Sequence, residues 1–277
     1  FTHPKYFNEI MRDLKPADDG TGLYRHGKVR FILSTEISLI YSSRLGGKRM
    51  HHLVLCPSLE VAAQINDALG KRGNLASDGR PILGLSSPEF ADILFSLSPD
   101  IMIIPAHAWT PWFAVFGSKS GVDRMEDAFE DRAKDIFAIE TGLSSDPAMN
   151  WMVSRLDRYS LVSNSDAHSL DNLGREANVF ELEEQPTFKG IRDAIRTRKG
   201  FTKTYEFYPE EGKYHYDGHR DCGIRWAPWE TKSHGGICTV CRKPVTVGVL
   251  NRVAELADRM MGEKPEGAVP FQYIVPL

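Results

Sequence analysis

The fold is decided by residues 161–169, which read LVSNSDAHS and end an apolar run that begins at Tyr159. A short apolar run that passes into small polar residues is typical of a buried strand reaching the rim of an α/β fold. Asp166 and His168 lie two residues apart, so their side chains point the same way from an extended backbone. A carboxylate and an imidazole directed to one side make a good pair of metal ligands. A polar turn with an exposed Asp and His is the simpler alternative.

Other apolar runs favour the metal site, because four of them also lie next to a His or a Glu. Strands are expected at 29–33, 53–55, 101–105, 136–139, 159–162 and 178–180. Helices are expected between them at 6–14, 58–69, 87–97, 123–134, 146–157 and 187–199. This alternation predicts an α/β fold with a parallel sheet covered by helices. The candidate ligands then gather at the C-terminal mouth of a barrel-like sheet; they are Glu36, His107, Glu140, Asp166 and His168.

Each candidate has a structural alternative. His3 precedes a proline and could simply cap a turn. His51 and His52 are adjacent at a strand start, so at most one of them faces the site. Glu140 could bond backbone amides of the loop that follows it. The aromatic residues after His107 would usually belong to the core, although a base-stacking wall beside the site is also open; they are Trp109, Trp112, Phe113 and Phe116.

Composition limits the classes of protein to consider. The 277 residues with 42% hydrophobic content can bury one good-sized core, or one core and a small appendage. A net charge of −3 excludes a globally basic protein, so any nucleic-acid contact must come from local patches. No apolar run approaches the ~20 residues of a membrane span. Four cysteines do not suggest a disulfide scaffold. We therefore expect a cytoplasmic protein without membrane contact.

Several motifs resemble those of the polymerase and histidinol phosphatase (PHP) superfamily. They are FTHP at 1–4, STEI at 34–37, His51 before LVL, PAHAW at 105–109 and SNSDAHS at 163–169. This resemblance implies a distorted (β/α)7 barrel with a cluster of up to three metal ions. It assigns metal ligation to His3, Glu36, His51, His107, Asp166 and His168, with Zn²⁺, Mg²⁺ or Mn²⁺ as the ion. Glu140 is implied as a further ligand or as a residue that positions the nucleophile, so the expected catalytic group is Asp166, His168 and Glu140.

Within the superfamily, the chain resembles endonuclease Q over essentially its whole length. The strings that carry this resemblance are GSKSG at 117–121, ETGLSSDP at 140–147 and GREAN at 174–178. It implies hydrolysis of DNA on the 5′ side of deaminated bases (uracil, hypoxanthine or xanthine) or of abasic sites. The superfamily's first motif, H-x-H, does not precede FTHP here, because the chain starts at the second motif. We therefore expect a barrel truncated at its N-terminus, with an unpaired strand edge and poor cleavage by residues 1–277 alone.

The composition changes at about residue 204, which predicts a metal-dependent phosphoesterase domain over 1–203 and a small zinc-binding domain over 204–277. Cys238 and Cys241 form a C-x-x-C pair led by two glycines, which is half of a zinc ribbon. His219 and Cys222 supply the other half, with fifteen residues between Cys222 and Cys238. His215 or His234 could replace His219 as the fourth ligand. A cluster of reduced cysteines without metal is the alternative.

Cations surround this expected zinc site, and tryptophans are interleaved with them. Such a patch suits phosphate contact and base stacking, although charged faces are usually just solvated. Lys119 and Arg175 lie on loops near the expected mouth of the barrel. The candidate DNA-contacting residues are therefore Lys119, Arg175, Arg225, Trp226 and Lys243.

Three functions from different classes are consistent with these patterns. The first is a metal-dependent endonuclease of DNA repair that acts as a monomer on damaged DNA, with replication or repair proteins as further candidate partners. The second is a phosphoesterase that acts on a small phosphomonoester through the same cluster, which leaves the zinc-binding segment unexplained. The third is a non-catalytic DNA-binding fragment that has lost barrel metals.

Overall fold

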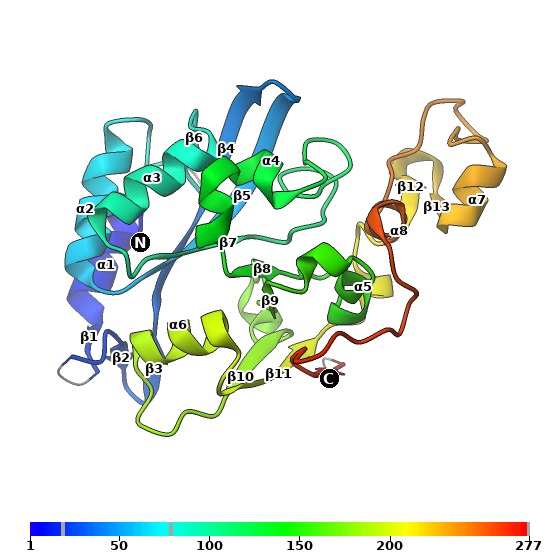
Figure 1. Ribbon diagram of the computed structural model, residues 1–277. Coiled ribbons are helices and arrows are strands. Elements are labelled where there is room, and N and C mark those ends of the chain that lie inside the picture. The colour runs from blue at the N-terminus through cyan, green and yellow to red at the C-terminus, as the bar shows by residue number, and fades with distance from the viewer. Residues whose placement is uncertain (18–19, 78–79, 276–277) are drawn as a thin grey trace.

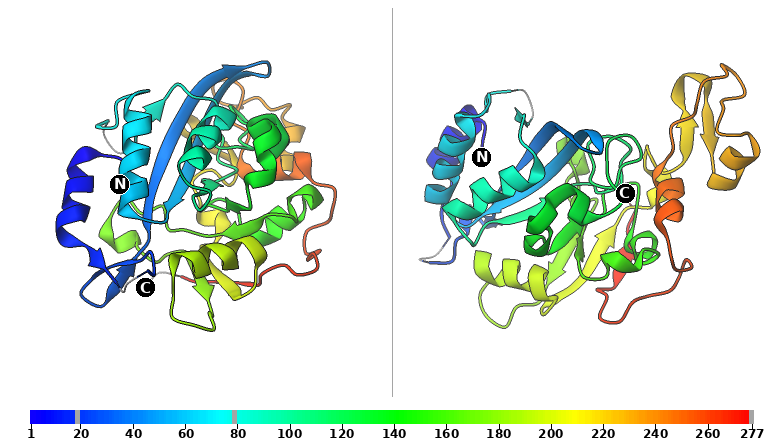
Figure 2. Two further views of the ribbon diagram at one scale, coloured as in Figure 1. Left: turned by 60° about the vertical axis from the view of Figure 1, so that its left-hand side comes forward. Right: turned by 45° about the horizontal axis from the view of Figure 1, so that its top comes forward.

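The computed structural model describes residues 1–17, 20–77 and 80–275 of the chain. A large α/β body carries a smaller unit that projects from it on the right of Figure 1, where β12 (Asp217–His219), β13 (Ile224–Trp226) and α7 (Pro228–Ser233) lie. Figure 2 shows the same projection from a second direction. No helix in the described ranges combines the length and the apolar character needed to cross a lipid bilayer.

A long antiparallel hairpin forms the centre of the body. It consists of β4 (Leu33–Ser43) and β5 (Gly46–Cys56), and Gly46 allows the tight turn with its φ of +89°. β6 (Ile82–Leu83) pairs parallel to β4, and β7 (Met102–Pro105) pairs antiparallel to β5. The resulting order is β6-β4-β5-β7. All four residues of β7 are buried.

This hairpin corrects two expectations from the sequence. The sheet is mixed rather than parallel. Glu36 lies inside β4 rather than after the end of a strand, and His51 lies inside β5 rather than at the start of a strand. The polar residues Ser34, Thr35 and Glu36 were interpreted as the end of a strand. In an antiparallel ribbon with one solvated face, polar residues can occur along the strand itself.

Three helices lie beside the hairpin: α1 (Pro4–Asp13), α2 (Leu59–Gly70) and α3 (Ser87–Leu97). Ser58 caps α2, and Ser86 forms a capping box with Glu89 at the start of α3. The apolar faces of α2 and α3 belong to the main core together with hairpin residues, for example Ile65, Phe90 and Val54. A small ribbon of β1 (Lys15–Pro16), β2 (Tyr24–His26) and β3 (Val29–Phe31) joins α1 to the hairpin.

The second half of the body contains two further sheets. β8 (Ala138–Glu140) pairs parallel to β9 (Ser160–Val162). β10 (Ala177–Phe180), β11 (Phe201–Glu206) and β14 (Phe271–Tyr273) form a three-stranded sheet. The helices and 3₁₀ turns of this half are α4 (Met125–Phe129), η1 (Glu130–Asp135), α5 (Pro147–Trp151), η2 (Ser154–Leu156), η3 (Leu170–Asn172) and α6 (Phe188–Thr197). Expected helices at 123–134 and 146–157 therefore each divide into a short α-helix and a 3₁₀ turn.

The described strands form separate hydrogen-bonded sheets, so the closed sevenfold barrel expected from the sequence is not confirmed. The expected domain boundary at residue 204 falls inside β11. In addition, β14 returns to pair with β11 through residues 271–273. The structure therefore places this last strand with the body, and the projecting unit lies between β11 and β14 in the sequence.

The projecting unit has a small core of its own, formed by Trp226, Cys238 and Val245. Its elements also include η4 (Pro209–Glu211) and η5 (Arg220–Cys222), and it leads into α8 (Val249–Leu256). α8 is eight residues long. It ends at Leu256 because the following residues bind the body instead: Asp258 accepts hydrogen bonds from Ser154, and Arg259 pairs with Asp157.

Candidate active site and zinc centre

Three ligand-type side chains meet between β4, β5 and the turn after β7. The register of the hairpin puts His51 opposite Ser38, which is two residues from Glu36. Residues two apart on a strand share a face, so the Glu36 and His51 side chains approach diagonally across the hairpin. His107 follows the end of β7, which pairs with β5. One ligand atom from each of Glu36, His51 and His107 lies within 4.8 Å of the others.

The separations within this cluster suit a metal ion. Glu36 Oε1 lies 2.9 Å from His51 Nδ1 and 3.4 Å from His107 Nε2, and these two nitrogens are 3.1 Å apart. Donors bound at about 2.0–2.2 Å to one metal ion lie ~3.0–3.5 Å from each other. Glu36 Oε1 is nevertheless buried without a well-aligned hydrogen bond in the described structure. Donor atoms that converge without satisfying one another fit a shared divalent cation.

The protonation of the cluster is set by burial and by its own charges. Burial opposes ionisation of Glu36, but His107, His51 and Arg80 outweigh it and hold the pKa of this carboxyl below its usual range. Burial lowers the pKa of the His51 imidazole, although Glu36 opposes this effect. An ionised carboxylate beside an imidazole with a free lone pair is the state that binds a metal ion.

Arg80 is a member of this site that the sequence did not indicate. Its Nη1 lies 2.7 Å from His51 Nδ1 and 3.1 Å from Glu36 Oε1. It lies just before β6, and no motif surrounds it. The parallel pairing of β6 with β4 brings it to the cluster, so only the sheet topology could have revealed it. Its guanidinium adds a positive charge beside the expected metal ligands.

The backbone around the cluster is strained. His107, Phe113 and Asp166 have φ angles of 31°, 59° and 43°, in the left-handed region that residues other than glycine rarely adopt. Such strain is usually found where a functional site requires a particular geometry. The Phe113 carbonyl accepts a hydrogen bond from the His51 amide, and the Phe113 ring stacks on His51 with centroids 4.6 Å apart. A Cβ on Gly142 would lie 2.7 Å from the Cβ of His107. Only glycine therefore allows the chain at position 142 to come this close to His107.

Glu140 supports the site through hydrogen bonds to neighbouring residues. Its Oε2 accepts the backbone amide of His107 at 2.7 Å, and its Oε1 accepts Asn164 Nδ2 at 2.7 Å. The side chain is buried, and burial raises its pKa. Glu140 therefore bonds a backbone amide, as the structural alternative predicted, but the amide belongs to His107 rather than to the loop after β8. In this arrangement it orients the His107 turn.

Asp166 and His168 lie on the loop after β9 and line the same pocket as His51 and His107. Arg175 fixes this loop, because it donates to the carbonyl oxygens of Ser165 and Asp166. The guanidinium of Arg175 is thus engaged with backbone, not directed at a free surface. The pocket has a volume of about 640 Å³ and is lined by His51, Arg80, His107, Thr110, Trp112, Phe113, Leu143, Ser144, Asp166, His168, Lys213 and Tyr214.

The structure places the other expected ligands and aromatics as follows. His3 caps α1, where its Nδ1 accepts the Lys5 amide, and it is not part of the Glu36–His51–His107 cluster. His52 faces the opposite side of the hairpin and packs on Phe129. Complete burial lowers the pKa of His52 to about 3. Of the aromatic residues after His107, Trp109 and Phe116 are core residues, whereas Trp112 is exposed.

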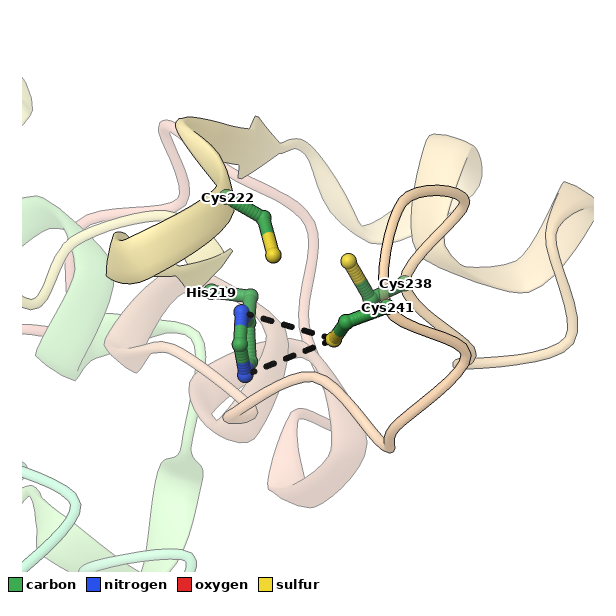
Figure 3. Close-up of side chains that lie close together, drawn as sticks. All are labelled: His219, Cys222, Cys238 and Cys241. Atoms are coloured by element: carbon green, nitrogen blue, oxygen red, sulfur yellow. Dashed lines mark hydrogen bonds between the residues drawn. The ribbon is translucent and has the colours of Figure 1, made fainter.

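A second cluster lies in the projecting unit. His219, Cys222, Cys238 and Cys241 present ligand atoms within 4.8 Å of one another, and Figure 3 shows their side chains pointing toward a common centre. Cys241 Sγ lies 3.8 Å from both ring nitrogens of His219. Ligands on the edges of a tetrahedral zinc site lie about 3.6–3.8 Å apart. This cluster could therefore bind zinc.

Of the three candidates for the fourth ligand, His219 is the one that lies with the cysteines. His215 is buried in the body, where its Nδ1 lies 3.0 Å from the Ser144 carbonyl. His234 stacks on Trp226 and contacts the Glu230 carbonyl. Neither residue belongs to the cysteine cluster.

Some of the candidate DNA-contacting residues are exposed, and others already contact other groups of the protein. Trp226 is only 9% exposed, because it packs in the core of the unit against His234 and Cys238. Its ring is therefore covered in this structure and is not open to a base. Arg225 lies over the Tyr216 ring and donates to the Glu210 carbonyl. Lys119 and Lys243 are exposed.

These observations describe a mixed α/β protein with a Glu–His–His cluster in a pocket and a separate His–Cys₃ cluster in a projecting unit. No protein-family model matches the chain. Two curated relatives are uncharacterised proteins. MJ0043 of Methanocaldococcus jannaschii is 32% identical over 177 residues, which cover 62% of this chain and 22% of that protein. YqxK of Bacillus subtilis is 29% identical over 268 residues, which cover 92% of this chain and 64% of that protein.

Two solved structures are similar to the chain over 99% of its length, each at 32% identity. One is the lesion-specific endonuclease PfuEndoQ from Pyrococcus furiosus, with a TM-score of 0.81. The other is endonuclease Q in complex with a 27-mer duplex substrate that has an abasic lesion at the active site, with a TM-score of 0.83. The chain covers 65% and 66% of these two proteins, so it spans slightly less than two thirds of their length. It is thus similar to endonuclease Q in both sequence and structure.

Proposed function

We propose that this protein is a metal-dependent endonuclease that hydrolyses DNA on the 5′ side of a damaged nucleotide, either a deaminated base (uracil, hypoxanthine or xanthine) or an abasic site. The observation that carries the proposal is the Glu36–His51–His107 cluster, open to a pocket, in a chain that is similar over 99% of its length to endonuclease Q bound to DNA with an abasic lesion. This pocket could hold one extruded nucleotide.

The residues of the pocket suit phosphodiester hydrolysis. Glu36, His51 and His107 would hold a divalent cation, which when bound supplies Lewis-acid stabilisation of the scissile phosphate and activation of water. Asp166 lies at the same pocket with its carboxylate partly exposed, where it can bind the cation or accept a proton from the attacking water. Lys213 and Arg80 provide positive charge for the phosphate on the pocket wall.

Two residues position this group without touching the substrate. Glu140 orients the His107 turn through the backbone amide, and Arg175 holds the Asp166 loop through two carbonyl oxygens. The strained φ angles of His107 and Asp166 indicate that these contacts keep both ligand-bearing loops in one conformation. Preorganised ligands of this kind reduce the cost of assembling the reactive geometry.

The projecting unit supports a nucleic-acid substrate rather than a small phosphomonoester. A zinc ion held by His219, Cys222, Cys238 and Cys241 would fix the unit, since four protein donors leave no open coordination position. Exposed cations surround this cluster, including Arg220, Arg225 and Lys243. They provide the local positive charge that a protein with a net charge of −3 needs for DNA binding.

The proposal is tested with end-labelled duplexes that contain one deoxyuridine, deoxyinosine, deoxyxanthosine or abasic site, incubated with Mg²⁺, Mn²⁺ or Zn²⁺. We expect a single nick on the 5′ side of the damaged nucleotide and no nick in an undamaged duplex of the same sequence. A small aryl phosphomonoester in a parallel reaction tests the phosphoesterase alternative. Turnover of that ester without any nicking would refute the proposal.

A further inference from the structure

Trp112 lies where three hollows of the surface meet. It lines the metal pocket, a hollow of about 520 Å³ beside the β4–β5 hairpin and another of about 530 Å³ against the projecting unit. Its side chain is 39% exposed, whereas Trp109 and Phe116 in the same loop are 1% exposed. The ring is therefore accessible to a ligand that enters any of these three hollows.

The two flanking hollows are positively charged. Arg49 and Lys119 are exposed on the hairpin side, where no carboxylate is among the described lining residues. Lys213, Arg220 and Arg225 are exposed on the other side. The one carboxylate there, Asp217, is buried and already accepts hydrogen bonds from Gly248 N and Asn251 Nδ2. Cations on both sides of the pocket, in a chain of net charge −3, complement a phosphodiester backbone that runs through it.

The loop that carries Trp112 is rigid. The Trp112 carbonyl accepts a hydrogen bond from Thr110 Oγ1, and the Pro111 carbonyl accepts the Lys119 amide. Gly117 packs so closely on this turn that a Cβ there would lie 2.3 Å from the Thr110 carbonyl oxygen. The Trp112 ring meets Tyr214 edge-on, with centroids 6.3 Å apart. A preorganised ring can enter a base stack without loss of its own conformational freedom.

We propose that Trp112 is a wedge that enters the DNA duplex beside the damaged nucleotide, while the cations of the two flanking hollows hold the phosphates on either side. This inference rests on the proposed endonuclease function. Extrusion of a nucleotide into the metal pocket leaves a gap in the base stack. The Trp112 ring, at the edge of that pocket, fills the gap and recovers stacking with the neighbouring base. The wedge therefore matters for lesions in paired DNA and is dispensable where no stack has to be opened.

The test compares single-turnover nicking of deoxyuridine in a fully paired duplex and in the corresponding single strand. Trp112→Ala should slow nicking of the duplex about tenfold or more, the order expected from loss of one base–aromatic stack, and change the single-strand rate less than about threefold. Trp112→Phe should retain most of the duplex rate. Trp229→Ala removes a tryptophan that is 71% exposed on the projecting unit and serves as the matched control. Melting temperatures of all variants establish that they fold.

Fluorescence of a 2-aminopurine placed next to the lesion gives a second readout that needs binding alone. It should rise when the wild-type protein binds the duplex and rise much less with Trp112→Ala. Equal duplex rates for wild type and Trp112→Ala, or equal losses on duplex and single strand, would overturn the wedge. If the wild type nicks neither substrate, the endonuclease proposal fails, and the fluorescence change alone then decides whether Trp112 opens the stack.

Discussion

The two candidate metal centres of this protein differ in how they are built. The Glu36–His51–His107 cluster draws its ligands from β4, β5 and the turn after β7, within the large core of the body. The zinc cluster takes its ligands from 23 consecutive residues, His219 to Cys241, around a core of three buried residues. The packing of the body holds the first centre in place, whereas the second centre has to stabilise the small unit around it. A closed set of four protein ligands is typical of structural zinc, and an open pocket is typical of a reactive site.

The largest expected effect is loss of the zinc ion. Cys238→Ser removes one of four ligands, and structural zinc can supply ~10 kcal/mol or more of folding free energy. We expect the projecting unit to unfold, with loss of about one zinc per chain by metal analysis and rapid proteolysis within residues 214–248. Cys56→Ala alters a buried cysteine in the body and should leave the zinc content unchanged. A Cys238→Ser protein with wild-type zinc content and thermal stability would show that the cluster does not bind zinc.

The next effect concerns the body, where metal loss should remove activity without unfolding. Asp166→Asn is nearly isosteric but removes a charge at the pocket, so nicking of a deoxyuridine duplex should fall at least about 100-fold. The melting temperature should change little, because Asp166 lies on an exposed loop. Asp171→Asn, on an exposed turn nearby that is not part of the pocket lining, is the matched control. Activity above a few per cent would place the chemistry elsewhere.

A third prediction concerns the pH dependence of the stability of the body. Burial, and then the nearby Glu206, raise the pKa of Glu176 to about 9 from an ordinary value of 4.5. Between these values the folded state keeps a proton that the unfolded state releases, so the free energy of unfolding decreases as the pH rises from 4.5 to 9. Glu176→Gln removes this dependence, so its stability relative to the wild type should increase as the pH rises from 5 to 9.

Thermal unfolding of wild type and Glu176→Gln from pH 5 to pH 9 checks this prediction. Glu184→Gln, at an exposed position, is the control. One Glu176 oxygen accepts the Phe207 amide at 3.3 Å, and the other is buried without a partner among the described residues. A pH profile that does not differ between wild type and Glu176→Gln would mean that water or a cation already compensates this carboxylate.

The smallest expected effect is a change in metal affinity on substitution of Arg80. Its guanidinium lies 3.1 Å from Glu36 Oε1, where its charge repels a bound cation. Arg80→Gln should therefore bind Mn²⁺ or Zn²⁺ at the pocket severalfold more tightly, as measured by titration calorimetry. Arg72→Gln changes an exposed arginine that donates to the Ala68 carbonyl, and this variant should bind metal like the wild type. Weaker metal binding by Arg80→Gln would show that Arg80 instead holds the ligands in place.

Local sequence patterns predicted several of the helices and strands and the residues of the His–Cys₃ cluster. The helices expected at 58–69 and 87–97 correspond to α2 and α3, although the cap of α3 is Ser86 rather than Ser87, and the apolar run at 101–105 contains the fully buried β7. The spacing of His219, Cys222, Cys238 and Cys241 predicted that these side chains meet, because all four are close in sequence. The long β4–β5 hairpin was missed, since its polar residues resemble a strand end.

The candidate ligand types are readable from local sequence: carboxylates and imidazoles beside apolar runs, and a His–Cys₃ set. Only the tertiary structure decided which of them meet. The hairpin register selects His51 for the cluster and turns His52 into the core, because successive side chains on a strand point to opposite faces. The pairing of β6 with β4 adds Arg80, and the packing of the 109–121 loop leaves Trp112 exposed while Trp109 is buried. These choices depend on contacts between residues far apart in the chain, which local periodicity and spacing do not record.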